Sequence, residues 1–86
     1  MYKFLYDYGK SLLEVAHMTF GEMLVILIDR SGITQTELAE RCGMSKQAIT
    51  ELIKGRAKEP SFSKAVAMAE VLDVSLSEMV DMLRGK

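Results

Sequence analysis

A short window of the sequence concentrates side chains that bind anions. Residues 44 to 58 contain four cations and one anion, so this window carries a local charge of +3. The whole chain has a formal net charge of −1, and the other residues therefore sum to −4. Nucleic acid responds to a local basic surface rather than to the charge of the whole protein. The cations are Lys46, Lys54, Arg56 and Lys58, and the anion is Glu51.

Groups suited to catalysis or metal binding are sparse. The chain has one His and one Cys, with no Cys-x-x-Cys pair, no glycine-rich phosphate loop and no cluster of metal ligands at a usual spacing. We therefore expect no enzyme activity, no metal and no cofactor. Cys42 occupies an apolar position directly before Gly43, which predicts a buried side chain rather than a reactive thiol.

Length and composition favour one small cytoplasmic domain. The chain has 86 residues, of which 49% are hydrophobic and 27% charged, a balance that excludes disorder. The longest apolar run, Met23 to Ile28, is too short to span a bilayer, so we expect no membrane association. The N-terminus lacks the basic segment, apolar segment and small-residue cleavage site that follow one another in a signal peptide. A single Cys cannot form an internal disulfide.

Helix start and stop signals predict an all-α fold with five short helices from Phe20 onward. Two capping boxes, Thr34–Glu37 and Ser75–Glu78, begin two of the helices, and Ser45 and Ser61 are N-cap candidates for two others. Glycines at 32, 43 and 55 are placed to end helices. The expected helices span residues 20–30, 35–42, 46–54, 62–72 and 76–84.

Residues 1–19 form an additional N-terminal segment with an ambiguous pattern. Aromatic side chains at alternate positions, Tyr2, Phe4, Tyr6 and Tyr8, suit one face of a strand. A repeat of about 3.6 residues also fits, through Met1, Leu5, Tyr8, Leu12 and Val15, and we favour the helix. A third interpretation is a leader ending at His17, with the natural start at Met18. The segment is either an extra core element or an arm for dimerisation or for a protein partner.

Residues 35–54 have the composition of two short helices that cross steeply. Such a crossing needs a small residue, here Ala39, and a turn residue that tolerates a positive φ, here Gly43. Ile49 and Leu52 are the apolar positions that anchor the second helix. The pattern predicts a helix-turn-helix.

The stretch ITQTELAERCGMSKQAITELIKGRAKEPSFSKAVAMAEVLDVSLSEM resembles the lambda-repressor-like helix-turn-helix proteins of the Cro and Xre type. The resemblance covers nearly all of residues 20–83 and leaves the first nineteen residues outside. It implies a compact five-helix DNA-binding domain over residues 20–84, with the helix-turn-helix at 35–54 and the recognition helix at 46–54.

The exposed side of the second helix is predicted to contact bases in the major groove. With Ile49 and Leu52 facing inward, the helical step of 100° per residue leaves the polar side chains on the opposite side. Gln can pair with adenine, Lys with guanine or a phosphate, Thr with the thymine methyl group and Glu with the amino group of cytosine. The candidate base-reading residues are Lys46, Gln47, Thr50 and Glu51.

Phosphate contacts are expected around the helix ends, where free backbone N–H groups and cationic side chains attract anions. The candidates are Thr34, Gln35, Ser45, Lys54, Arg56 and Lys58. We expect a sequence-specific regulator of transcription, most simply a repressor, that binds a two-fold site in double-stranded DNA as a homodimer. Candidate dimer surfaces are the N-terminal segment and the last helix, through Met79, Val80 and Leu83. The alternatives are an antitoxin-type regulator and a protein-interaction module with the same fold.

Overall fold

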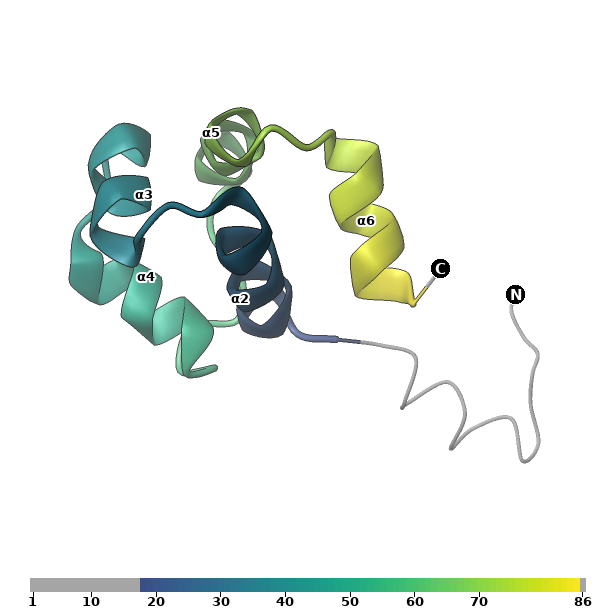
Figure 1. The fold of residues 1–86 in the computed structure, drawn as a ribbon. Helices are drawn as coiled ribbons and strands as arrows, with labels where there is room; N and C mark the ends of the chain where they lie inside the picture. Colours follow the sequence, from purple (N-terminus) through teal and green to yellow (C-terminus); the bar gives the residue numbers. More distant parts are fainter. Residues whose placement is uncertain (1–17, 86) are drawn as a thin grey trace.

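The computed structural model describes residues 18–85. These residues form five α-helices and no strand, as predicted for an all-α fold. Figure 1 shows α2 in the middle, with α3 and α4 on one side of it and α6 on the other. The predictions for residues 1–17, helix, strand, leader or arm, fall outside the described residues. The helices are α2 (Phe20–Ser31), α3 (Gln35–Cys42), α4 (Lys46–Ile53), α5 (Phe62–Leu72) and α6 (Leu76–Arg84).

Every helix in residues 18–85 begins at a Ser or Thr whose hydroxyl oxygen accepts a hydrogen bond from the backbone N–H three residues later. Within this part of the chain, the reciprocal capping box forms at Thr19 and Glu22, where the Glu22 carboxylate accepts from the Thr19 N–H at 2.9 Å. The two capping boxes predicted from the sequence are wrong in one of their two hydrogen bonds, the one from the N-cap backbone N–H to the Glu carboxylate. Glu37 lies 3.9 Å from Arg41 and Glu78 lies 3.6 Å from Arg30, so each carboxylate faces a cation instead.

The helices end largely at the residues that the sequence predicted. Gly32 and Gly43 adopt left-handed conformations, with φ of 78° and 68°, that a side chain would strain. Asp73 ends α5 in the same region, at φ 58°, without being a glycine. α4 ends at Ile53, one residue earlier than predicted, and Lys54 is its C-cap.

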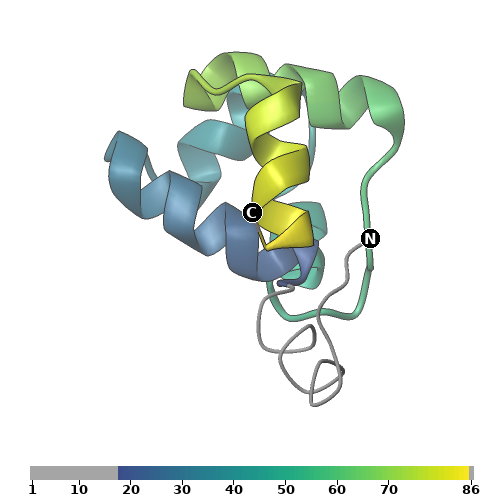
Figure 2. The ribbon, with the colours of Figure 1, turned by 90° about the vertical axis from the view of Figure 1, so that its right-hand side faces the viewer.

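One hydrophobic core lies between the helices. Cys42 belongs to it, as predicted. Met79 is also fully enclosed, so the prediction that it contributes to an exposed face of the last helix is wrong; Val80 beside it is exposed. α6 covers the side of α2 that faces the viewer in Figure 2. The buried side chains are Phe20, Met23, Leu24, Leu27, Leu38, Ala39, Cys42, Ile49, Leu52, Met68, Ala69, Leu72 and Met79.

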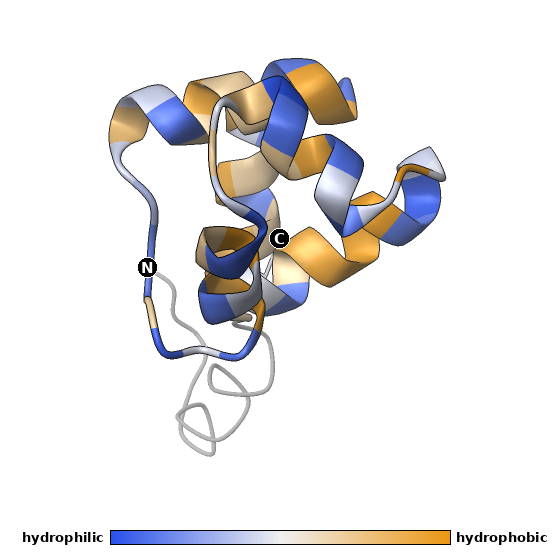
Figure 3. Ribbon diagram, turned by 90° about the vertical axis from the view of Figure 1, so that its left-hand side faces the viewer, coloured by the Kyte–Doolittle hydropathy of each residue, from blue (hydrophilic) through white to orange (hydrophobic). Residues whose placement is uncertain are grey.

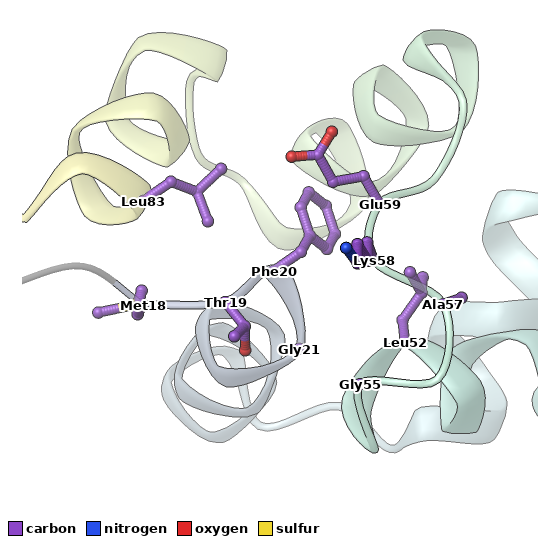
Figure 4. A pocket seen from close by; sticks show the side chains of 10 residues that line it. All are labelled: Met18, Thr19, Phe20, Gly21, Leu52, Gly55, Ala57, Lys58, Glu59 and Leu83. Atoms are coloured by element: carbon purple, nitrogen blue, oxygen red, sulfur yellow. The ribbon is translucent and has the colours of Figure 1, made fainter. Parts of the chain in front are cut away.

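The first turn of α2 approaches the end of α4 closely at Gly21. A Cβ at this position would overlap the backbone oxygen of Leu52 and would lie 2.8 Å from the backbone oxygen of Ile53. Phe20 next to it points into a cleft between Leu83 of α6 and the connection at Glu59 (Figure 4). α2 therefore supports α4 through backbone contact. No helix in residues 18–85 combines the length and apolar composition needed to cross a membrane.

Candidate nucleic-acid interface

α3 and α4 form the predicted helix-turn-helix. Leu38 and Ile49 are completely buried between the helices, and Ala39 is buried beside them. The turn is closed by the backbone N–H of Met44, which donates to the carbonyl oxygen of Ala39 at 2.8 Å, and by the positive φ of Gly43. The small side chain, the glycine turn and the apolar anchor thus have the roles that the sequence predicted.

A lysine from α5 supports the turn, and the sequence analysis missed it. The ammonium Nζ of Lys64 donates to the backbone oxygen of Gly43 at 3.2 Å and lies 3.4 Å from that of Cys42. These carbonyls belong to the C-terminal end of α3, where a helix carries partial negative charge. Lys64 lies 21 residues beyond Gly43, so no local pattern reveals the contact.

Cys42 is the last residue of α3, directly before this turn, and its side chain is buried. Burial raises the pKa of its thiol above the ordinary value of 9.0, while the positive charges of Lys64 and Arg41 lower it in part. A thiol with a raised pKa carries little thiolate at neutral pH, which fits a packing role.

The outward side of α4 carries the four candidate base-reading residues. Lys46 and Gln47 are exposed in its first turn, whereas Thr50 and Glu51 are half-buried one turn later. Ser45 caps this helix by accepting from the N–H of Ala48 at 3.0 Å. The four side chains therefore come from one short helix that is anchored from behind by buried apolar residues.

Apart from Ser45 at the start of α4, the candidate phosphate-binding residues lie at two places. Thr34 and Gln35 stand at the start of α3, where the Thr34 hydroxyl accepts from the N–H of Glu37 at 3.0 Å. Lys54, Arg56 and Lys58 follow α4, and all three are exposed. Figure 3 shows that the connection from α4 to α5 is mainly hydrophilic. Both places adjoin the ends of the helix-turn-helix.

Glu51 and Arg56 form an ion pair, which the sequence analysis did not foresee. Oε2 of Glu51 accepts from Nη1 of Arg56 at 2.9 Å. One residue predicted to contact a base and one predicted to contact a phosphate are therefore joined to each other before any ligand is present. Lys46, Lys54 and Lys58 pair with no carboxylate among residues 18–85.

Comparison with known proteins agrees with this geometry. The HTH_3 helix-turn-helix family matches residues 26–79, more than half of the chain. These residues include α3, the turn and α4 in full. No solved structure matches the chain significantly.

A curated relative from Thermococcus kodakarensis (strain ATCC BAA-918 / JCM 12380 / KOD1) is 32% identical over 66 residues. Its name reads "Putative HTH-type transcriptional regulatory protein TK0539". The match covers 77% of this chain but only 20% of the relative, so the chain spans about a fifth of the length of that relative. The family match supports a helix-turn-helix domain in this chain, and transcription regulation is what the name of the relative states for that protein. Helix-turn-helix regulators of this type are typically not enzymes. With its buried α3–α4 anchor, its glycine turn and this family match, the chain belongs to the helix-turn-helix family.

Proposed function

We propose that this protein is a cytoplasmic, sequence-specific regulator of transcription that binds double-stranded DNA through α4. The observation that carries the proposal is the exposed polar side of α4, which lies in a helix-turn-helix of the matched family. The lysines beside it form no ion pair with a carboxylate of residues 18–85. A helix of this kind fits the major groove of B-DNA, where each base pair presents a distinct pattern of donors and acceptors.

Base recognition is assigned to α4. Gln47 is exposed in its first turn and can make the paired hydrogen bonds to adenine N6 and N7. Lys46 beside it can donate to guanine or to a phosphate, and Thr50 can contact a thymine methyl group. Glu51 is assigned the amino group of cytosine, since a carboxylate only accepts hydrogen bonds.

Phosphate contacts are assigned to the two helix starts and to the connection after α4. The N-termini of α3 and α4, at Thr34–Gln35 and at Ser45, present free N–H groups and positive dipole ends toward an anion. Lys54 and Lys58 add exposed cationic charge. These contacts fix the register of the protein on DNA and make binding depend on salt.

A homodimer is the assembly that the geometry favours. α4 has eight residues and can reach only a few base pairs, whereas two copies about 34 Å apart on one face of DNA double the contacts. Large apolar side chains that remain exposed on α5 and α6 supply a candidate dimer surface. They are Phe62, which is 77% exposed, Leu76 and Val80. The repressor role follows if such a dimer occupies a promoter.

The test is selection of bound duplexes from a random DNA pool, followed by titration of the enriched sequence at several salt concentrations. We expect a two-fold symmetric consensus with half-sites one helical turn apart and an affinity that falls steeply with salt. Weak binding at low salt only, without enrichment, would reject sequence-specific DNA recognition. It would favour an interaction module or an antitoxin-type regulator, for which a co-purifying protein is the next measurement.

A further inference from the structure

The contact between Glu51 and Arg56 involves both side chain and backbone. In addition to the 2.9 Å ion pair, the backbone oxygen of Glu51 accepts from the N–H of Arg56 at 3.0 Å and from that of Ala57 at 3.1 Å. The connection after α4 is thus held against the last turn of the helix by two hydrogen bonds to the backbone oxygen of Glu51. Because the backbone bonds hold Arg56 beside Glu51, the ion pair needs no further ordering of the backbone, and its entropy cost is that of the two side chains.

The two side chains differ in exposure. The Glu51 side chain is 30% exposed and that of Arg56 is 62% exposed. Solvent screens a half-buried carboxylate less than a free surface charge, so a nearby cation matters more to it. The positive charge of Arg56 therefore has a larger electrostatic effect on the Glu51 carboxylate than it would have on a fully exposed one.

This pairing changes the charges available to DNA. The guanidinium and the carboxylate neutralise each other, so the local charge of +3 resides in Lys46, Lys54 and Lys58. An unpaired Glu51 on α4 would be repelled by the phosphates on both sides of the groove. A neutralised Glu51 is repelled far less.

The geometry points to Arg56 as a positioning residue for base recognition, an inference that rests on the proposed DNA-binding function. Arg56 binds Oε2 of Glu51, and since Oε1 has no hydrogen-bond donor among residues 18–85, it can accept from the N4 amino group of a cytosine. Arg56 thereby contributes to sequence preference and not to a phosphate contact, in contrast to the role predicted for it from the sequence.

The pair also selects against guanine and thymine, but not on the same ground against adenine, whose N6 amino group is a donor in the major groove. In the major groove guanine offers two acceptors and thymine offers an acceptor and a methyl group, and a carboxylate gains no hydrogen bond from any of these. A carboxylate left without a donor in a desolvated groove loses the hydrogen bonds it made to water. Discrimination against guanine and thymine at this position therefore comes from rejecting these two bases as well as from the cytosine contact.

The experiment begins with the wild-type protein and the random DNA pool, and then measures variants on the enriched site and on its single-base changes. Arg56→Gln removes the partner of Glu51 without shortening the side chain to a methyl group. The double variant Glu51→Gln/Arg56→Gln removes both charges and keeps the net charge constant. Lys54→Gln is the matched control, because it removes one exposed cation that pairs with no carboxylate among residues 18–85.

For Arg56→Gln, we expect the preference for cytosine at one position of each half-site to fall about five- to tenfold. This preference is a ratio measured on one protein, so a change in the folded fraction alone does not move it. For the double variant, we expect the same loss of preference with an unchanged slope of log affinity against log salt. Lys54→Gln is expected to lower that slope by about 0.9 per protomer with the base preference intact.

Two results would overturn the inference separately from the proposed function. If the double variant lost about 0.9 per protomer in salt slope, Arg56 would be a phosphate contact. If Arg56→Gln weakened binding to all sequences equally, it would have no part in base preference. Failure of the wild-type protein to enrich any sequence would instead reject the proposed function itself.

Discussion

The ammonium group of Lys64, in the first turn of α5, donates a hydrogen bond to the backbone oxygen of Gly43 at 3.2 Å. The contact joins α5 to the turn of the helix-turn-helix, and the oxygen of Cys42 lies within reach of the same ammonium group at 3.4 Å. A single side chain thus satisfies carbonyls that a helix end leaves without partners. It adds a polar contact to the apolar packing of α3 on α5.

Lys64→Met should destabilise the domain by about 1 kcal/mol, because it removes a charged donor from the negative end of α3 while keeping the aliphatic stem. The measurement is urea unfolding followed by circular dichroism. Lys58→Met is the matched control, since Lys58 is exposed and has no described carboxylate partner. Equal unfolding midpoints for the two variants would show that the Lys64 contact adds nothing to stability.

Gly21→Ala should destabilise the domain by about 1–3 kcal/mol, or more if the helices cannot separate. The added methyl group would overlap backbone atoms of Leu52 and Ile53, which cannot rotate away as a side chain can. The same urea experiment measures the loss. Asp29→Ala, at an exposed position of the same helix, tests whether alanine in α2 is itself harmful. If Gly21→Ala were as stable as the wild type, the close approach of α2 and α4 would be wrong.

Cys42 should make stability depend on alkaline pH. Burial raises the pKa of its thiol in the folded state above the ordinary value of 9.0, so folding favours the protonated form. This contribution is complete below about pH 9 and decreases as the pH rises through the folded-state pKa. We expect the urea midpoint of the wild type to fall more between about pH 8 and pH 10.5 than that of Cys42→Ala.

A thiol reagent provides an independent check on Cys42. The folded protein should react slowly at neutral pH, because the side chain is buried and carries little thiolate, and should react at the rate of a free thiol once unfolded. Rapid modification of the folded protein would contradict the packing role.

Gln47→Ala and Lys54→Ala should have different effects on DNA binding. Gln47→Ala should relax the base preference at one position, at a cost of about 1–3 kcal/mol for the preferred base. Lys54→Ala should weaken binding to all sequences alike and reduce the salt slope by about 0.9 per protomer. Titration of the selected site and its variants at several salt concentrations separates the two. An unchanged base preference in Gln47→Ala would remove this residue from the readout.

Local signals in the sequence determine much of the fold. The N-caps at Thr34, Ser45 and Ser75 and the glycine turn at Gly43 are present as predicted. These features depend on a hydroxyl three residues from a free N–H or on one backbone dihedral angle. A pattern within four residues contains all the atoms involved, and for the same reason the exposed side of α4 follows from its helical repeat.

Even some local predictions depended on distant atoms. The Glu78 carboxylate faces Arg30 of α2 instead of completing a capping box at Ser75. The Ser75 cap is intact, but the choice of partner for a flexible carboxylate is decided by which cation the packing of α6 on α2 brings near.

The sequence by itself determined the helices, their turns and the amino acids that α4 exposes. Only the tertiary structure decided that Met79 is enclosed, that Gly21 lies against the backbone of α4, that Lys64 supports the turn and that Arg56 pairs with Glu51. The physical reason is the distance along the sequence between the interacting residues. Caps and turns form from neighbouring residues, whereas these contacts arise where the chain returns to itself, and packing decides among side chains that local patterns treat as equivalent.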